Sequence, residues 1–298
     1  MALVAFVVNR TLLRDPRRFL LRCRAAATDR GWEPWFGPAG GVHDSLALTR
    51  RAVAVGASLV FAAGGDGTVR ACAEALAGTG VALAIVPLGT ANLTARALGV
   101  PSQGGRAVEA GFGGRDQAID LGHVTLAEGA GGTWFAAMAG IGLDAAVVAG
   151  AGERLKRRLG WAAYAAAGVR RLALPPREFT IRPDGAEPLH RRARSVVVAN
   201  AGLLPGGFTL LPAARLDDGL LDVGILAPSG GWDWIRLAGR VLAQGGRQDR
   251  ALECLQARRV QVSADAVLPR QIDGEIVAPG RALTVSLCPG TLTVRLPG

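Results

Sequence analysis

Residues Ser58–Leu98 read SLVFAAGGDGTVRACAEALAGTGVALAIVPLGTANLTARAL, and they carry the clearest structural pattern in the chain. An apolar run over 58–63 meets a glycine-rich turn at 64–68, and a second apolar run over 81–86 meets a polar turn at 87–92. A helical pattern closed by a glycine separates the two apolar runs. The sequence therefore predicts two strand–turn–helix units that lie side by side in a parallel sheet.

The two turns place small polar residues at the carboxyl ends of neighbouring strands, the edge at which open α/β sheets bind ligands. Glycines let the backbone approach a phosphate closely, and the N–H groups of the following helix favour anions. A glycine-rich turn of this kind also occurs as a plain tight turn. Asp66 favours a ligand site, because a carboxylate repels phosphate and makes most sense beside a metal ion or as an acceptor for loop N–H groups.

The composition fits a globular protein of two domains, with 298 residues, of which 50% are hydrophobic and 19% charged. The formal net charge is +10, and the basic residues are arginines apart from Lys156. Such an excess predicts an anionic partner, namely a nucleotide, an anionic lipid surface or nucleic acid. No nucleic-acid-binding motif is visible, so a membrane surface is favoured over nucleic acid.

Cysteine usage and the N-terminal residues predict a reduced, cytosolic protein. The four cysteines are widely spaced without a CxxC pair, and the histidines show no metal-ligand spacing. The first apolar run is too short for a signal peptide. The most apolar long segment, 134–152, contains Asp144 and four glycines, which predicts a buried strand–turn–helix rather than a transmembrane helix.

Outside the opening stretch, alternating strands and helices continue to about residue 122, among them a basic helix over 14–27 and a strand over 32–36 that is followed by a loop over 37–41. This alternation predicts a parallel sheet with right-handed crossovers. After that point short β-type runs, among them 132–139 and 271–276, alternate with turns, a spacing typical of a β-sandwich. We therefore expect a first domain over 1–122, a β-rich domain over 123–288, and a last strand within 289–298 that returns to the first domain.

The strings GGDGT at 64–68 and GTANLTAR at 89–96 resemble the diacylglycerol kinase catalytic domain of bacterial lipid kinases and of their sphingosine and ceramide kinase relatives. The resemblance covers nearly the whole chain and is closest to actinobacterial-type members. It implies a Rossmann-like, NAD-kinase-like α/β domain that binds ATP, followed by a β-sandwich domain that binds the lipid acceptor.

The resemblance also implies a set of ATP-binding residues: Asn9, Gly64, Gly65, Asp66, Gly67, Thr68, Val69, Arg70, Thr90 and Asn92. The chain departs from the family pattern at the residues that follow Asn9 and Asn92. Arg10 stands where the family usually has proline, and Leu93 stands where many members have aspartate. The second departure puts in doubt the metal and water network that the aspartate would help to organise.

The segment LLPAARLDDGLLDV at 210–223 closely resembles a family segment that binds a structural magnesium ion. By position, Asp218 would supply a carboxylate, while Arg215 and Leu220 would supply backbone carbonyls. Oxygen ligands of this kind suit a hard cation such as Mg²⁺. Without the resemblance, the Asp-Gly pair in this segment predicts only a hairpin turn.

The string Asp273-Gly274-Glu275 matches the acceptor-side acids of the lipid kinases. On an extended strand Asp273 and Glu275 would share a face, with Glu275 as the base for the lipid hydroxyl and Asp273 orienting the hydroxyl or a metal. From the residues alone, Asp-Gly between two β-type runs predicts a hairpin turn, with Glu275 facing solvent.

A basic segment with aromatic residues at 153–172, ERLKRRLGWAAYAAAGVRRL, fits two structures. One is a solvated helix packed on the sandwich, and the other is an interfacial helix whose arginines meet anionic head groups. Together with the resemblance, the segment favours a cytoplasmic protein that associates peripherally with an anionic membrane surface. A homodimer is left open.

The predicted function is therefore an ATP-dependent lipid kinase that phosphorylates the hydroxyl of diacylglycerol or a similar neutral lipid. NAD kinase, which shares the GGDGT loop, is one alternative and would act on a soluble nucleotide. A degenerate kinase fold that serves as a lipid-binding regulator is another. The residues that follow Asn9 and Asn92 keep this second alternative open, whereas the intact GGDGT string argues against it.

Overall fold

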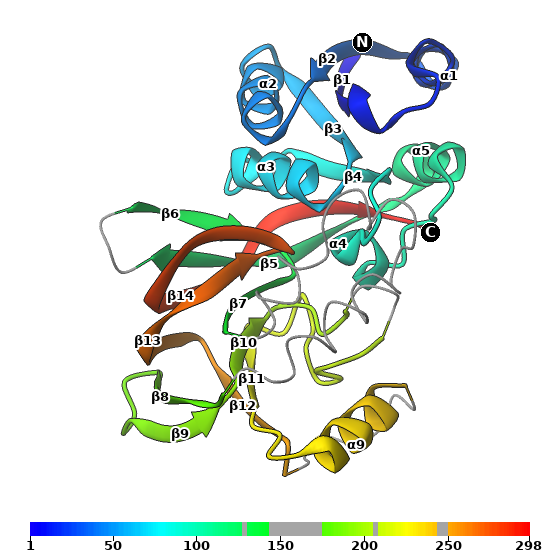
Figure 1. Cartoon of the computed structure of the whole chain (residues 1–298). Helices are drawn as coiled ribbons and strands as arrows, with labels where there is room; N and C mark the ends of the chain where they lie inside the picture. The colour runs from blue at the N-terminus through cyan, green and yellow to red at the C-terminus, as the bar shows by residue number, and fades with distance from the viewer. Residues whose placement is uncertain (127–129, 143–174, 205–207, 243–249) are drawn as a thin grey trace. The chain divides into compact units, whose positions relative to one another are not determined.

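The computed structural model describes residues 1–126, 130–142, 175–204, 208–242 and 250–298 (Figure 1). The chain divides into two compact units. Unit 1 contains Met1–Asp120 together with Gly290–Gly298, and unit 2 contains Leu121–Pro289. The boundaries expected from the sequence lay at 122 and 289. Among the described residues no helix combines the length and the apolar character needed to cross a bilayer.

Unit 1 is built on a parallel sheet whose strand order is β2-β1-β3-β4. Its strands are β1 (Ala2–Asn9), β2 (Trp32–Ala39), β3 (Ala57–Gly64) and β4 (Ala82–Pro87). Its helices are η1 (Arg10–Leu12), α1 (Pro16–Thr28), α2 (Val42–Ala54), α3 (Asp66–Leu76), α4 (Leu93–Ala97) and α5 (Gly104–Gly113). The predicted alternation of strands and helices is therefore present.

The sheet of unit 1 is covered on both faces, with α1 and α5 on one side and α2 and α3 on the other (Figure 1). On the first side, Phe6 stacks on Phe61 with ring centroids 4.8 Å apart, in a core that includes Cys23 of α1 and Val108 of α5. On the second side, α2 and α3 pack against each other. Because β1, β3 and β4 are buried on both faces of the sheet, their sequences are continuously apolar over most of their length instead of alternating.

The cysteines are free thiols, as expected for a reduced protein. Burial raises the pKa of Cys23 and of Cys72 to about 12 in each case. The Cys72 thiol also accepts a hydrogen bond from the Thr49 hydroxyl, 3.2 Å away, which joins α3 to α2. These two thiols are therefore part of the core, and they are not nucleophiles at neutral pH because their pKa is so high.

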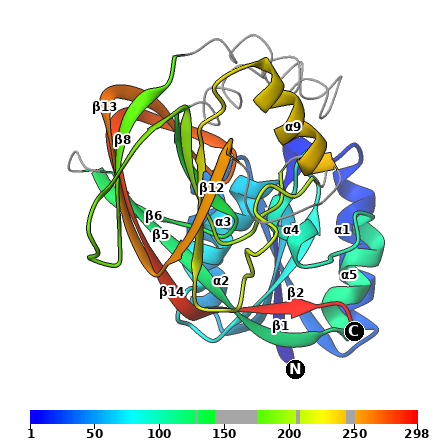
Figure 2. The same cartoon turned by 90° about the horizontal axis from the view of Figure 1, so that it is seen from below.

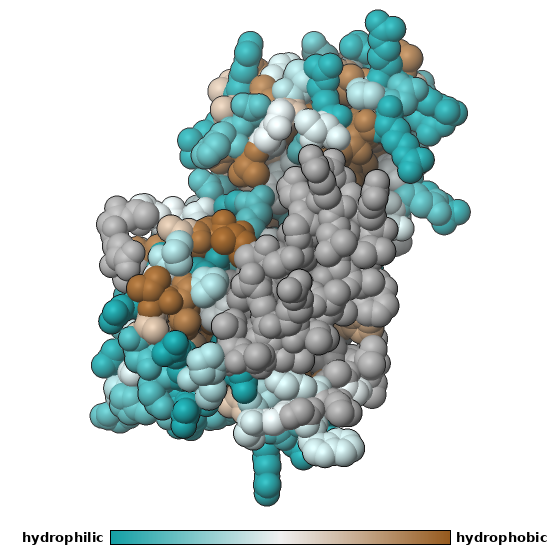
Figure 3. All heavy atoms as spheres, viewed as in Figure 1, coloured by the Kyte–Doolittle hydropathy of each residue, from teal (hydrophilic) through white to brown (hydrophobic). Residues whose placement is uncertain are grey.

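Helix α1 presents a basic, solvent-exposed face, as its sequence predicts. It begins after Asp15, whose carboxylate accepts the N–H of Arg18 at 3.0 Å, and Pro16 occupies its first helical position. Its arginines are exposed, and Leu21 beside them is 66% exposed. Figure 3 shows hydrophilic side chains gathered over α1 and α2.

The end of the chain completes unit 1. The Asp120 carboxylate is 4% exposed and accepts the N–H of Gly290 at 2.8 Å. Further along, Arg295 forms an ion pair with Asp116, and Val294 pairs in parallel register with Leu83 of β4. These contacts hold residues 290–298 within unit 1.

Unit 2 is rich in strands, most of them antiparallel. Described in chain order, its elements are β5 (Arg115–Leu126, which begins in unit 1), β6 (Ala130–Phe135), β7 (Met138–Gly142), β8 (Arg177–Pro183), β9 (Leu189–Ala193), β10 (Ser195–Ala199), β11 (Leu221–Leu226), α9 (Gly231–Leu242), β12 (Leu252–Ala257), β13 (Arg259–Ile272) and β14 (Glu275–Leu296, whose end lies in unit 1). One run of neighbours is β12-β11-β10-β7-β13, and β13 also pairs with β8 and β14.

The strands of unit 2 enclose one apolar core, as a sandwich requires. Residues from every strand from β5 to β14 except β12 contribute buried side chains to this core, among them Phe135, Phe179 and Ile272. On the outer face of β7 and β10 to β12, α9 packs through Leu237 and Trp234, and Figure 2 shows the helix beside β12.

The strand expected over 132–139 is two strands, β6 and β7, because Ala136 and Ala137 interrupt it. The N–H groups of these two residues donate to a side chain instead of to a neighbouring strand. The strand expected over 271–276 is also wrong, since β13 ends at Ile272 and β14 begins at Glu275. Helix α9 was not predicted.

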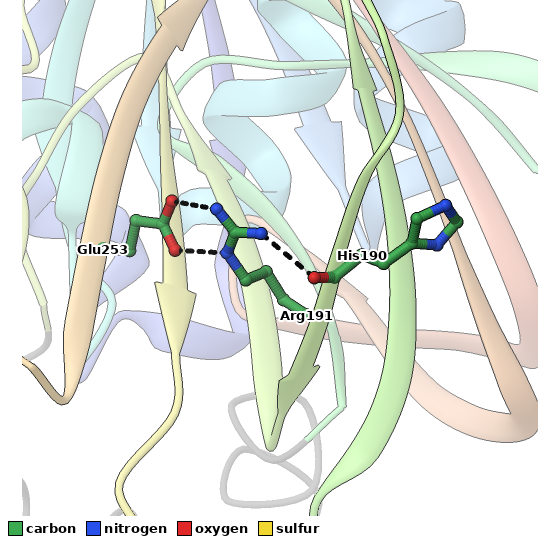
Figure 4. Close-up of polar contacts among 3 residues, drawn as sticks. All are labelled: His190, Arg191 and Glu253. Atoms are coloured by element: carbon green, nitrogen blue, oxygen red, sulfur yellow. Dashed lines mark hydrogen bonds and ion pairs between the residues drawn. The ribbon is translucent and has the colours of Figure 1, made fainter.

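An ion pair joins two strands of unit 2 that are not hydrogen-bonded neighbours (Figure 4). Arg191 of β9 donates from Nε and Nη2 to the two carboxylate oxygens of Glu253 of β12, at 2.7 and 3.0 Å. Arg191 also donates from Nη1 to the carbonyl of His190 at 3.0 Å. The hydrogen bonds from Arg191 lower the pKa of the Glu253 carboxyl group. Both side chains are more than a third exposed, so the pair stabilises unit 2 by about 1 kcal/mol or less.

Candidate functional site

The polar residues of unit 1 gather at the carboxyl ends of three adjacent parallel strands. Asn9 ends β1, the glycine-rich loop follows β3, and residues 88–92 follow β4. Because β1, β3 and β4 are neighbours in the sheet, these segments share one edge. The Asn9 side-chain oxygen accepts the Thr11 N–H at 3.1 Å and the Thr11 hydroxyl at 2.7 Å, which starts the short helix η1.

Glycines bring the two loops into backbone contact. A Cβ added to Gly89 would lie 2.6 Å from the Cα of Gly65, so only glycine fits at position 89 without displacing the other loop. Gly64 is also closely packed, since a Cβ there would lie 2.3 Å from the Thr68 hydroxyl oxygen. The carbonyl of Gly64 accepts the N–H of Leu88 at 2.8 Å, which adds a hydrogen bond between the loops.

Asp66 ties the first loop to the second. Its Oδ1 accepts the backbone N–H of Leu93 at 2.6 Å. The sequence allowed this carboxylate two roles, as a neighbour of a metal ion or as an acceptor for loop N–H groups. The hydrogen bond to Leu93 is an example of the second role. The bond uses the backbone of residue 93, so it does not require the aspartate that many relatives carry there.

The second loop is closed by Asn92, which adopts a left-handed conformation with φ 48°. Its Oδ1 accepts the N–H of Gly89 at 3.0 Å, and its Nδ2 donates to the carbonyl of Gly89 at 2.7 Å. An asparagine tolerates this backbone region better than most residues. The amide group of Asn92 therefore shapes the loop, whereas Thr90 is exposed at its tip.

The first loop runs directly into α3, whose N-terminal cap is Gly65. No side chain caps this helix end, so the loop leaves backbone N–H groups of its first turn at the sheet edge. Thr68 and Val69 are buried, and Gly67 and Arg70 are partly exposed. An uncapped helix N-terminus beside glycines is a geometry that suits a phosphate group.

In unit 2 the predicted acids lie on the hairpin that joins β13 to β14. Asp273 and Gly274 have φ values of 47° and 77°, so they form a tight turn rather than an extended strand. The expectation that Asp273 and Glu275 share a strand face is therefore wrong. Glu275 begins β14 and lies opposite Ile272 in the ladder. It is partly buried, so it is not the fully solvent-facing residue of the alternative interpretation either.

The Asp273 carboxylate binds backbone N–H groups. Its Oδ2 accepts from Ala136 at 3.0 Å, and its Oδ1 accepts from Ala137 at 2.8 Å and from Met138 at 2.9 Å. The side chain is 3% exposed. A carboxylate that is buried and accepts three such bonds is poorly placed to take a proton from a substrate.

The turn has a second support that sequence reasoning missed. Gln271 is 2% exposed, and its Oε1 accepts the N–H of Gly274 at 2.8 Å. The spacing of three residues fits a side chain that caps its own turn, and this local signal was available in the sequence. Asp273 and Gln271 together fix the backbone immediately before Glu275.

The candidate magnesium residues lie on the turn that leads into β11. Asp218 is exposed, and its Oδ1 accepts the Leu220 N–H at 3.0 Å, while the Arg215 side chain pairs with Asp217 at 3.2 Å. Among the described residues no cluster of three His, Cys, Asp or Glu side chains could hold a metal. A cation here would rely on the Asp218 carboxylate, on backbone carbonyls and on water, a donor set that fits Mg²⁺.

Two sequence features lie outside the described residues. The basic segment 153–172 is one of them, and Asp144 in the preceding turn is the other. The interfacial-helix interpretation of 153–172 therefore stays a prediction from the sequence.

Two family models match the chain and together cover most of it. The diacylglycerol kinase catalytic domain matches residues 4–124. The YegS C-terminal NAD kinase beta sandwich-like domain matches residues 137–296. These matches confirm the predicted order of an α/β domain followed by a β-sandwich domain.

Curated relatives are similar along almost the whole length. A Pseudomonas aeruginosa protein named "Probable lipid kinase YegS-like" is 37% identical over 259 residues, which cover 85% of this chain and 82% of the relative. A Pseudomonas fluorescens protein of the same name is 34% identical over 288 residues, which cover 96% of this chain and 92% of the relative.

Solved structures share the fold at lower identity. A Bacillus anthracis protein named "putative diacylglycerol kinase" aligns with a TM-score of 0.80 at 22% identity, over 99% of this chain and 95% of that chain. An NAD kinase from Archaeoglobus fulgidus, solved in complex with ATP, aligns with a TM-score of 0.54 at 12% identity, over 99% of this chain and 94% of that chain.

Proposed function

The chain belongs to the family of YegS-like lipid kinases, and from this we propose that it transfers the γ-phosphoryl group of ATP to the hydroxyl of diacylglycerol or a similar neutral lipid. The observation that carries the proposal is the match of both units to the two domain models of this family. The products would be ADP and a phosphatidic-acid-type lipid.

In this proposal the carboxyl edge of the unit 1 sheet binds ATP. The glycine loop over 64–68 and the uncapped start of α3 supply backbone N–H groups for the phosphates. Asn9, Thr90 and Asn92 border the same edge. The two loops are held together by backbone contacts, so the site is formed before ATP arrives and little ordering is needed on binding.

Glu275 is the proposed base for the lipid hydroxyl. A base must come within hydrogen-bond reach of the proton that it removes, which requires an accessible carboxylate. Glu275 is partly exposed at the start of β14, whereas the Asp273 carboxylate is buried against three backbone N–H groups. The geometry therefore supports Glu275 as the base and gives Asp273 a positioning role.

Magnesium is proposed at the turn that contains Asp218, with the carbonyls of Arg215 and Leu220 as further ligands. Asp218 and its neighbours are exposed or partly exposed, and the Oδ1 bond to the Leu220 N–H preorients the carboxylate. A bound cation there would stabilise this turn of unit 2. A magnesium ion that accompanies ATP would neutralise phosphate charge during transfer.

We also propose that the protein works at the cytoplasmic surface of an anionic membrane, because its lipid acceptor resides there. The exposed arginines of α1 and the sequence of segment 153–172 support this proposal. Binding to vesicles should rise with their anionic lipid content and fall with salt. Binding that is independent of both would contradict it.

The test of function is a transfer assay with labelled ATP. The full chain is incubated with vesicles that contain diacylglycerol or other neutral lipids, and separately with NAD as a soluble acceptor. We expect label in a phosphorylated lipid, and we expect the Glu275→Gln variant to be nearly inactive. Label in NAD alone would replace the proposed acceptor, and no label in any acceptor would refute the kinase proposal.

A further inference from the structure

The two residues between β6 and β7, Ala136 and Ala137, lie in a short break of the unit 2 sheet. Their N–H groups are accepted by the Asp273 carboxylate, as described above. Their carbonyl groups accept hydrogen bonds from a different residue, Asn200. Asn200, which follows β10, donates from its side-chain Nδ2 to the carbonyl of Ala136 at 3.1 Å and from its backbone N–H to the carbonyl of Ala137 at 2.8 Å.

The break is therefore held between two buried polar side chains, one on each side of its backbone. Asn200 is 0% exposed and Asp273 is 3% exposed. A buried amide or carboxylate without hydrogen bonds costs free energy, so each of these side chains depends on the break as much as the break depends on them. The break, Asn200 and Asp273 therefore form one buried group of hydrogen-bonded residues.

This group of hydrogen-bonded residues is connected to Glu275, the proposed base, through two backbone links. The N–H of Asp273 donates to the carbonyl of Met138 at 2.8 Å, which fastens the β13–β14 turn to the start of β7. Glu275 then lies two residues beyond Asp273, opposite Ile272 in the ladder. A shift of the break would move the turn, and with it the position of the Glu275 carboxylate.

From these contacts we propose that Asn200 is a positioning residue for Glu275. By holding the carbonyl of Ala136, it fixes the backbone on which Asp273 rests, and it thereby sets where the carboxylate of Glu275 meets an acceptor hydroxyl. Asn200 itself touches no reacting atom in this scheme. The inference rests on the proposed function for its catalytic consequence, but its structural half can be tested without any substrate.

The same pair of strands offers a matched control. Ser195 lies at the other end of β10, is also 0% exposed, and donates from its hydroxyl to the carbonyl of Ile141 in β7 at 3.1 Å. Asn200 and Ser195 thus make the same type of bond, because each donates from a side chain at one end of β10 to a backbone carbonyl, in the break before β7 for Asn200 and in β7 itself for Ser195. Of these two side chains, Asn200 is the one that bonds to the break that Asp273 holds.

The experiment compares Asn200→Ala, the milder Asn200→Ser and Ser195→Ala in the full chain, each assayed well below its own melting temperature. For Asn200→Ala we expect kcat to fall by about tenfold to a hundredfold, the size expected when a catalytic group loses its alignment. The KM for ATP should stay within about twofold, because ATP binds to other residues. Asn200→Ser should give an intermediate kcat, and Ser195→Ala should keep the wild-type kcat.

Hydrogen exchange at the Gly274 and Met138 amides supplies a readout that needs no activity. Both amides should exchange faster in Asn200→Ala and at the wild-type rate in Ser195→Ala. The inference is overturned if exchange is unchanged in Asn200→Ala, or if both alanine variants lose kcat to the same extent. If the wild type phosphorylates no lipid, the proposed function fails, and the exchange result alone then supports or overturns the role of Asn200 in holding the turn.

Discussion

Replacing Gly89 with alanine should separate the two loops of the unit 1 sheet edge. The new Cβ would lie 2.6 Å from the Cα of Gly65 and 2.9 Å from the Oδ1 of Asn92. Neither atom can move away easily, since the Gly65 Cα belongs to the backbone and the Asn92 Oδ1 accepts a hydrogen bond from the N–H of residue 89 itself. Restoring an ordinary contact of 3.4 Å from 2.6 Å requires a displacement of about 0.8 Å, and overpacking of this kind costs about 1–3 kcal/mol of stability.

The displacement should also weaken ATP binding. A hydrogen bond of about 2.9 Å that lengthens by this amount is no longer a hydrogen bond. Losing one bond to a charged phosphate costs about 1.5–3 kcal/mol. Since about 1.4 kcal/mol is a factor of ten in affinity, the dissociation constant for ATP should rise by roughly tenfold to a hundredfold.

Isothermal titration with ATP and chemical unfolding measure the two effects separately. The matched control is Gly41→Ala, at the start of α2 on the same sheet edge, where an added Cβ meets nothing within 4 Å and φ is −175°. This variant should bind ATP like the wild type. A folded Gly89→Ala protein with wild-type affinity and stability would refute the reasoning, and so would an equal loss in both variants.

Three further changes test other parts of the molecule. Glu275→Gln keeps the shape of the side chain and removes the proposed base, so kcat should fall by roughly 100-fold or more with little change in ATP affinity, and near-normal turnover would reject this residue as the base. Magnesium is expected to raise the melting temperature of the wild type, and Asp218→Ala should abolish this rise, whereas an equal rise in both proteins would reject the metal assignment. Because Arg191 lowers the pKa of Glu253, the stabilisation from this pair is present above the ordinary glutamate pKa of about 4.3 and is lost as pH falls through the lower folded value. Glu253→Gln should therefore lose about 1 kcal/mol or less at neutral pH and show a shallower loss of stability on acidification, as measured by urea unfolding between pH 7 and 3.

Much of unit 1 could be predicted because its signals are local. Apolar runs of strand length end in glycine-rich turns, and the structure has β3 and β4 within a residue or two of the predicted bounds. The main difference is β2, which continues through Pro38 to Ala39, where the sequence predicted a loop. Pro38 is tolerated because β2 is the edge strand of the sheet, so its missing N–H removes no ladder bond.

Helix α9 could not be predicted for a different reason. Its segment contains Gly231 and Gly239, which lower helix propensity, and it follows another glycine. Tertiary packing provides what the local sequence lacks, because Leu237 is buried and Trp234 packs against the same outer face of the sheet. Propensity summed along the chain does not contain this information.

The candidate site was predicted where it depends on types of residue and missed where it depends on partners. The sequence identified Asp66 as an acceptor for loop N–H groups or a metal neighbour, but nothing local pointed to the Leu93 amide as the donor. For Asp273 the gap is larger, since its donors lie 135 to 137 positions earlier in the chain. Only the fold brings such distant segments together.

The Asp273-Gly274-Glu275 string shows why the two sequence interpretations did not exclude each other. The turn interpretation is right about the backbone, since Asp273 and Gly274 both have positive φ. That same turn buries the first carboxylate against the break between β6 and β7 and leaves the second acid at the partly exposed start of β14. If both acids lay on one strand face, they would be interchangeable candidates for the base. The turn makes them unequal, so Asp273→Asn should act mainly through the position of the turn, whereas Glu275→Gln should remove the proposed base without moving the turn.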